Sequence, residues 1–143
     1  MTQFDRFRVL VVEDEWPARN YLVELLDASG RADVVAAVAT IEEARQALER
    51  GGQLPLDLAF VDVNIVGSGE NAGLELVREF AARPDAPAFV LATAFRQHAL
   101  EAFELGVVDY LTKPFTEERV QNCLERILAR RAPSAPERAP SGR

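Results

Sequence analysis

Asp57-Leu-Ala-Phe-Val61, with Asp62 directly after it, is the stretch of this chain that says most about its fold. An unbroken run of apolar residues is typical of a short strand that is buried on both faces. Such strands belong to parallel sheets, because helices then cover both sides of the sheet. The carboxylate of Asp62 is costly to desolvate at the end of this run unless a positive group balances it, so we expect a partner for it there.

Four more apolar runs of this kind occur, at residues 8–12, 33–38, 87–92 and 107–111. The segments between them place apolar side chains at helical spacing, and their ends carry residues that start or stop helices. Pro17 lies in the first turn of the first such segment, and Thr40 with Glu43 forms a capping box at the start of the second. Strand and helix therefore alternate five times, which predicts an α/β fold with a doubly wound, five-stranded parallel sheet and five helices.

The composition describes a folded domain with an acidic surface. The 143 residues include 23 Asp and Glu against 16 Lys and Arg, and the net charge of -7 argues against binding to nucleic acid. The single Cys123 cannot form an intrachain disulfide, no apolar run approaches the ~18 residues of a membrane helix, and residues 1–8 hold no signal-peptide core. We therefore expect a cytoplasmic chain that binds no membrane.

Residues 1–131 are predicted to form the domain, and residues 132–143 a disordered C-terminal tail or linker.

Polar side chains follow four of the five predicted strands. Glu13-Asp14-Glu15 follows the first, Asp62 the third and Thr93 the fourth, while Lys113, the chain's only lysine, follows the fifth. Parallel strands bring their carboxyl ends to one edge of the sheet, where ligands bind. Carboxylates that meet there repel unless a hard divalent cation such as Mg²⁺ lies between them. The cation, the lysine and the hydroxyl could then hold a phosphoryl group, with Asp62 as the nucleophile that forms an acyl phosphate.

Four motifs carry a resemblance to a known family: Val11-Val-Glu-Asp-Glu15, Phe60-Val-Asp62, Ala92-Thr93-Ala94 and Asp109-Tyr-Leu-Thr-Lys-Pro-Phe115. With them the sequence resembles the receiver domain of bacterial two-component response regulators, most closely the LytR/AlgR type. The resemblance spans about residues 8–130 and implies a flavodoxin-like sheet with the strand order 2-1-3-4-5.

The resemblance also implies a role for each residue of the site. Asp62 would accept a phosphoryl group from a phosphohistidine on a sensor histidine kinase or a histidine phosphotransfer protein. Asp14, Asp62 and the backbone carbonyl of Asn64 would ligate Mg²⁺ directly, while Glu13 would act through a water molecule.

Further implied roles concern the switch. Thr93 and Lys113 would contact the phosphoryl oxygens, the Lys113-Pro114 peptide bond would be cis, and Tyr110 would turn inward as Thr93 moves. The surface formed by the helix from residue 99, the strand at 107–111 and the helix from residue 116 would then change its preference for a partner. That partner would be a downstream protein, an output domain missing from this chain, or a second copy that forms a homodimer. Such a chain is a signalling phosphoacceptor and not an enzyme.

Two other functions fit parts of this pattern. An aspartyl-phosphate phosphohydrolase of the haloacid-dehalogenase type also combines an Asp nucleophile after a strand with Thr or Ser, Lys and Mg²⁺. Those enzymes use a second Asp two positions after the nucleophile as general acid, and Asn64 stands there in this chain with no such proton to give. The other alternative is a receiver-like interaction module that is never phosphorylated, and the intact set of acids, hydroxyl and lysine argues against it.

The chain departs from the family's pattern in the loop after Asp62. The family usually places a glycine about eight positions beyond the phosphoacceptor, whereas Gly73 follows Asp62 by 11 positions here. Residues 66–72 therefore form a loop that is longer than usual and borders the predicted site.

Two side chains outside the motifs also receive an interpretation. Phe95, just beyond the fourth strand, is predicted to shield Asp62 from attacking water. Cys123 falls on the apolar stripe of the last helix, so we expect a buried, unreactive thiol.

Overall fold

The structure, a computed structural model, describes residues 6–49 and 55–131, so the predicted tail at residues 132–143 lies outside the described residues. The strands are β1 (Phe7–Val12), β2 (Ala32–Val38), β3 (Leu58–Val61), β4 (Ala88–Thr93) and β5 (Asp109–Thr112). The helices are α1 (Trp16–Ala28), α2 (Ile41–Glu49), α3 (Ala72–Phe80), α4 (Ala99–Glu104) and α5 (Glu117–Arg131), and a 3₁₀ helix, η1 (Arg96–His98), leads into α4. The predicted alternation of strands and helices is confirmed.

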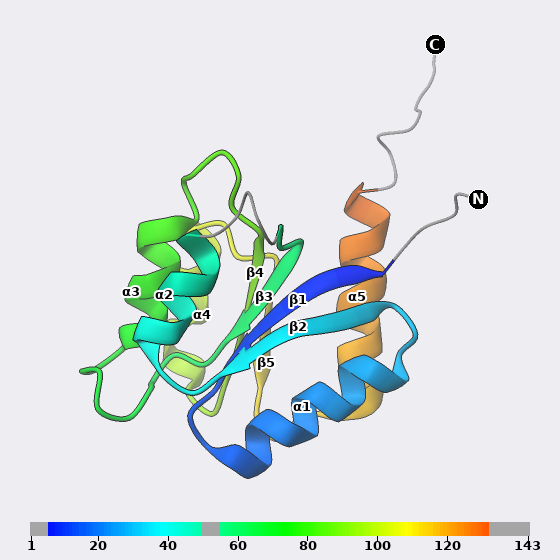
Figure 1. Cartoon of the computed structure of the whole chain (residues 1–143), viewed down its shortest axis with the longest axis horizontal. Helices are drawn as coiled ribbons and strands as arrows, with labels where there is room; N and C mark the ends of the chain where they lie inside the picture. The colour runs from blue at the N-terminus through cyan, green and yellow to red at the C-terminus, as the bar shows by residue number, and fades with distance from the viewer. Residues whose placement is uncertain (1–5, 50–54, 132–143) are drawn as a thin grey trace.

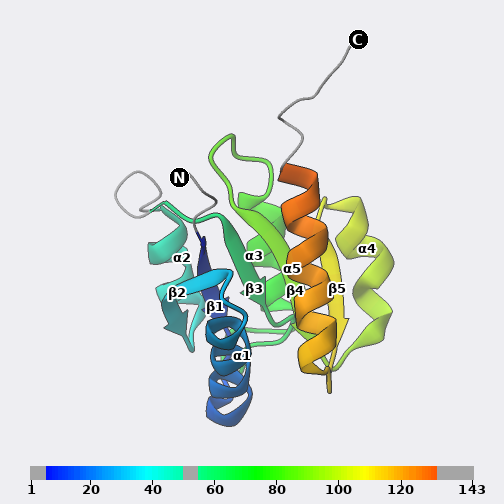
Figure 2. The ribbon, with the colours of Figure 1, turned by 90° about the vertical axis from the view of Figure 1, so that its right-hand side faces the viewer.

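All five strands lie in one parallel sheet with the order β2-β1-β3-β4-β5, which confirms the doubly wound, flavodoxin-like topology. Helices cover both faces of the sheet: α1 and α5 lie on one side, and α2, α3 and α4 lie on the other (Figure 1). Figure 2 shows α1 and α5 in front of the sheet after a quarter turn.

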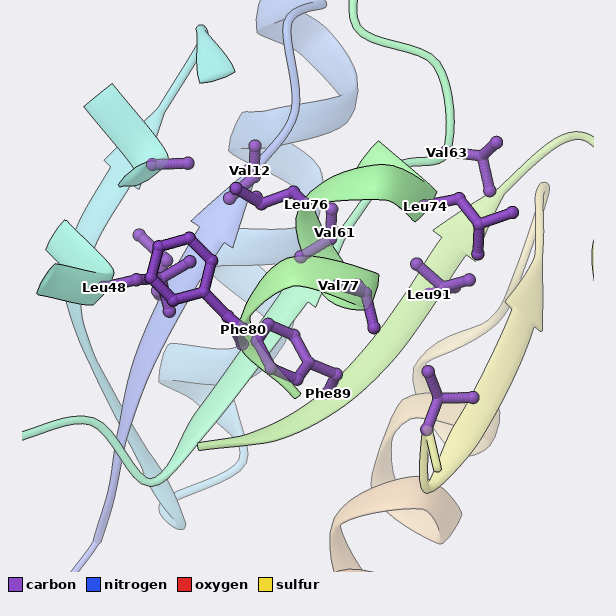
Figure 3. Close-up of a cluster of buried hydrophobic side chains, with 14 of the residues drawn as sticks. Val12, Leu48, Val61, Val63, Leu74, Leu76, Val77, Phe80, Phe89 and Leu91 are labelled. Carbon is purple, nitrogen blue, oxygen red and sulfur yellow. The ribbon is translucent and has the colours of Figure 1, made fainter. Parts of the chain in front are cut away.

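Alternate residues of the inner strands pack on opposite faces of the sheet. In β1, Leu10 and Val12 belong to the apolar cluster beneath α2, α3 and α4, whereas Val9 and Val11 belong to the cluster beneath α1 and α5. Figure 3 shows the first cluster, in which Phe80 of α3 lies among side chains of the central strands. Both faces of the inner strands are therefore closed, and the open approach to them is at the strand ends.

β2 contradicts the prediction that every strand is buried on both faces. Within β2 only Ala32 is buried, and Asp33 and Ala37 are exposed, whereas all four residues of β3 are buried. β2 lies at one edge of the sheet, and its run of Val and Ala has the same apolar composition as a central strand. Edge position alone does not expose a strand, because β5 at the other edge is buried at Asp109, Tyr110 and Leu111.

The start of α2 carries a side-chain cap. At the start of α2 the Thr40 hydroxyl accepts the N–H of Glu43 at 3.1 Å, which is the first bond of the predicted capping box. The Glu43 carboxylate reaches back one residue further than in that motif and accepts the N–H of Ala39 at 3.3 Å. Within residues 6–49 and 55–131, every helix is too short or too polar to cross a bilayer.

Candidate functional site

The register of the sheet brings the predicted site residues to one edge. β1 and β3 end level with each other because Val12 lies beside Val61, and β4 and β5 end level because Thr93 lies beside Thr112. The residues that follow β1, β3 and β5 are Glu13, Asp62 and Lys113.

Three carboxylates meet at this edge. Oxygen atoms of Glu13, Asp14 and Asp62 lie within 4.8 Å of one another. Glu13 and Asp62 are only 4% and 8% exposed, and Asp14 is half-buried. Carboxylates this close repel each other unless a cation neutralises them, and carboxylate oxygens are the ligands that Mg²⁺ takes in proteins. The donor set therefore fits a hard divalent cation.

Lys113 is the positive partner that Asp62 requires. Its Nζ donates to Asp62 Oδ2 at 2.9 Å and also to the Glu13 carboxylate. Burial alone would lower the pKa of Lys113, but the two carboxylates outweigh burial and raise it. Burial raises the pKa of Glu13, although the bonds from Lys113 and from the Glu15 N–H work in the opposite direction. The ammonium group therefore keeps its charge at neutral pH while it bridges two acids.

Arg19 of α1 supports the acidic loop, and the sequence analysis missed it. Its guanidinium donates to the backbone carbonyl of Glu13 at 2.9 Å and to that of Asp14 at 3.4 Å. These bonds give partners to carbonyls at the point where the chain leaves the sheet. The sequence feature that could have indicated this role is an arginine near the start of the helix that follows the acidic run.

Thr93 ends β4 and is fully buried, and its carbonyl accepts the N–H of Lys113 at 2.8 Å. Its hydroxyl accepts the N–H of Phe95 at 3.3 Å, and the Tyr110 hydroxyl donates to the carbonyl of the same Phe95. Tyr110 is 8% exposed, so its ring already lies inward in this structure, and burial raises the pKa of its phenol. Phe95 therefore connects the strand-end hydroxyl with the tyrosine.

The peptide bond between Lys113 and Pro114 is cis, as the resemblance implies.

Asp62 opens onto a cavity of about 340 Å³ at the carboxyl edge. Phe95 and Val66 stand at its rim, 39% and 83% exposed. The other residues that line the cavity are Asp14, Glu15, Asn64, Ala94 and Lys113. The carboxylate that the sequence singles out therefore borders this cavity although it is buried in the fold.

Gly73 explains how the chain accommodates its long loop. A Cβ on Gly73 would lie 1.7 Å from the backbone oxygen of Asp62, so α3 packs directly against the backbone of the candidate phosphoacceptor. The Gly73 N–H also donates to the Val63 carbonyl at 2.7 Å. The extra residues are accommodated between Ile65 and Gly73, and the contact between α3 and Asp62 is kept.

A third buried acid lies in β5, away from this cluster. Asp109 is 2% exposed, and Arg119 of α5 donates to both of its carboxylate oxygens, at 3.0 and 2.7 Å. Burial would raise the pKa of Asp109, but the bonds from Arg119 and the Tyr110 N–H lower it overall. Cys123 is fully buried beside Asp109, and burial raises the pKa of its thiol, which confirms the predicted buried position. This ion pair fastens α5 to β5.

The fold and the edge residues define a class of protein: flavodoxin-like α/β domains with an aspartate-centred acidic site at the carboxyl edge of the sheet. The family model described as "Response regulator receiver domain" matches residues 9–125. The chain belongs to this family, the receiver domains of two-component response regulators.

Curated relatives support the subgroup. Sensory transduction protein LytT of Bacillus subtilis is 42% identical over 119 residues, which are 83% of this chain and 47% of that protein. Transcriptional regulatory protein LytR of Staphylococcus aureus is 32% identical over 125 residues, which are 87% of this chain and 48% of that protein. The predicted similarity to LytR-type receivers is confirmed. The chain spans about half the length of these curated relatives.

A solved structure agrees with the fold. The crystal structure of the response regulatory domain of protein mrkE from Klebsiella pneumoniae matches with a TM-score of 0.77 at 29% identity, covering 86% of this chain and 96% of that chain.

Proposed function

We propose that this domain is the phosphoacceptor switch of a two-component system, in which Asp62 receives a phosphoryl group from a phosphohistidine on a sensor histidine kinase or a histidine phosphotransfer protein. The arrangement around Asp62 carries the proposal. Its carboxylate borders an accessible cavity, accepts a hydrogen bond from Lys113 at 2.9 Å and lies within 4.8 Å of two other carboxylates. This combination suits a nucleophile whose product is an acyl phosphate with a dianionic phosphoryl group.

The transfer step forms one bond to phosphorus and breaks another. An oxygen of Asp62 forms a bond to phosphorus while the bond from phosphorus to the donor's imidazole nitrogen breaks. The donor ring is protonated on its other nitrogen, so it leaves as neutral imidazole. Lys113 and the Thr93 hydroxyl hold the phosphoryl oxygens after transfer. Lys113 suits this role because its Nζ is already within hydrogen-bond distance of Asp62.

Mg²⁺ would be held directly by Asp14, Asp62 and the backbone carbonyl of Asn64, and by Glu13 through a water molecule. Bound there, the ion would neutralise the carboxylates and the charge on the phosphoryl oxygens. The contacts of Glu13 support its indirect role, because one of its carboxylate oxygens accepts from Lys113 and the other accepts the Glu15 N–H at 3.1 Å.

The response to phosphorylation would pass through Thr93, Phe95 and Tyr110 to the surface formed by α4, β5 and α5. The two hydrogen bonds that meet at Phe95 support this route. On α4, Leu100 and Phe103 are 75% and 50% exposed, which supports contact with a protein partner. The partner would be a downstream protein, an output domain or a second copy in a homodimer.

Residues 1–131 would form the receiver, and residues 132–143 a tail or linker, in a cytoplasmic protein.

We further propose that the domain promotes only its own phosphorylation and dephosphorylation and is no phosphohydrolase for other substrates. Asn64 supports this, because it stands where such an enzyme needs an acid that can donate a proton.

Incubation with Mg²⁺ and acetyl phosphate, followed by intact-mass measurement, tests the proposal. We expect one added phosphoryl group on the wild type and on Asp33→Asn, a control that removes an exposed carboxylate from β2. No gain is expected for Asp62→Asn or in the presence of EDTA. An unmodified wild type would contradict the proposal and favour the interaction module that is never phosphorylated.

A further inference from the structure

We infer that the side chain of Asn64 is a positioning residue that sets the Mg²⁺ affinity of the site, by fastening the base of the loop at residues 66–72 to Asn71. The inference rests on the proposed function, because it concerns the cation that the acidic cluster is proposed to bind. It adds a task for the Asn64 amide that is separate from the ligand role of its backbone carbonyl.

The fastening is a single hydrogen bond across the two ends of the loop. Asn64 Oδ1 accepts the backbone N–H of Asn71 at 2.8 Å. Asn71 has a φ of 60°, a left-handed conformation at the start of α3. This conformation directs its N–H back toward the segment that follows β3. Asparagine adopts such a conformation more readily than most residues with a side chain.

The fastened segment contains two of the proposed ligands. Beside the bond to Asn71, the N–H of Asn64 donates to Asp62 Oδ1 at 3.4 Å, and the Gly73 N–H donates to the Val63 carbonyl at 2.7 Å. Residues 62–64 are thus tied to residues 71–73 at two points. The direction of the Asn64 carbonyl and of the Asp62 carboxylate therefore depends on this connection. Contacts that orient ligands in this way raise the affinity of metal sites.

The long loop makes the connection necessary. The loop between β3 and α3 extends away from the body of the domain (Figure 1). Val66 at its start is 83% exposed, and Gly67 and Gly69 both have positive φ values, 86° and 91°. Lengthening a loop costs little closure entropy, but it leaves more conformations open to the residues at its base. The amide of Asn64 restricts that freedom at the point where the loop meets the site.

The test measures how Mg²⁺ raises the melting temperature of each variant, because the increase with concentration gives the dissociation constant. Asn64→Ala removes the acceptor. Asn71→Val disfavours the positive φ that aims the donor, whereas the matched control Asn71→Gly keeps both the N–H and that conformation. Ser68→Ala is a second control within the loop.

We expect Asn64→Ala and Asn71→Val each to weaken Mg²⁺ binding about 3- to 10-fold, the range for one lost hydrogen bond. The double variant should bind no more weakly than either single variant, because both remove the same bond. Asn71→Gly and Ser68→Ala should bind like the wild type. If Asn64→Ala does not fold, the comparison of Asn71→Val with Asn71→Gly decides.

Two results would overturn the inference. In the first, the wild type binds Mg²⁺ and Asn64→Ala and Asn71→Val bind it with the same affinity as the wild type, or Asn71→Gly binds it as weakly as Asn71→Val. The bond then does not set the Mg²⁺ affinity, and the proposed function stands. If Mg²⁺ fails to stabilise the wild type at all, the inference and the metal site of the proposed function fail together.

Discussion

Replacing Gly73 of α3 with alanine should destabilise the domain more than adding a methyl group at Gly67 or Gly69 of the loop at residues 66–72. The new Cβ would lie 1.7 Å from the backbone oxygen of Asp62, 2.8 Å from its carbonyl carbon and 3.0 Å from the oxygen of Val63. All three atoms belong to the backbone just beyond β3, so no side chain can rotate to make room.

The size of the effect follows from these distances. To restore even 3.0 Å between Cβ and oxygen, α3 or the end of β3 must move by about 1.3 Å. Overpacking in a well-packed region costs about 1–3 kcal/mol, and more where the backbone must shift. We therefore expect Gly73→Ala to lose about 3 kcal/mol or more, a large part of the roughly 5–15 kcal/mol typical of a whole domain.

Urea denaturation, followed by circular dichroism, measures the loss. Gly69→Ala is the matched control: its φ is 91°, and no atom lies within 4 Å of the added Cβ. The control should lose only about 1–2 kcal/mol, from backbone conformation alone. A Gly73→Ala variant as stable as Gly69→Ala would refute the close approach of α3 to Asp62.

Two further predictions concern other parts of the domain. Asp109→Asn should lower the unfolding free energy by about 1–3 kcal/mol at pH 7, a moderate loss because the Arg119 side chain is 35% exposed and can be hydrated. The pKa of Asp109 is lowered in the folded state, so its contribution is complete above the unfolded pKa of about 3.9 and is lost as the pH falls toward the folded pKa. Denaturation curves should therefore show a smaller difference in unfolding free energy between wild type and variant at pH 3 than at pH 7. The same difference at both pH values would contradict the ion pair. Phe95→Ala should speed the loss of the phosphoryl group from Asp62 several-fold, as followed by intact mass after removal of the donor, and an unchanged rate would show that Phe95 does not exclude water.

Much of the fold and of the site could be predicted from the order of the residues. In a parallel sheet the strands end at one edge, so residues that directly follow apolar runs must come together there. This reasoning brought Glu13, Asp62 and Lys113 to one place, and their contacts in the structure agree with it. It worked because each residue is tied to a strand end and not to the shape of a loop.

The contacts that could not be predicted are those that depend on loop shape or on the faces of helices. The bond from Arg19 to the carbonyls of Glu13 and Asp14 depends on how α1 leaves the sheet. The bond between Asn64 and Asn71 depends on a left-handed residue at the end of an irregular loop. Neither leaves a periodic pattern in the sequence. The exposed residues of β2 were missed for a different reason, because its run of Val and Ala has the same apolar composition as a buried strand.

The most direct test of Asp62 as the phosphoacceptor is to determine which residue carries the phosphoryl group. An aspartyl phosphate is an acyl phosphate, which borohydride reduces to an alcohol, so a phosphorylated aspartate becomes homoserine and can be located by peptide mass spectrometry. After incubation with Mg²⁺ and acetyl phosphate, we expect homoserine at position 62 and an unreduced aspartate at Asp14. Homoserine at Asp14, or a phosphoryl group located on His98 with Asp62 unmodified, would contradict the assignment of Asp62 as the phosphoacceptor.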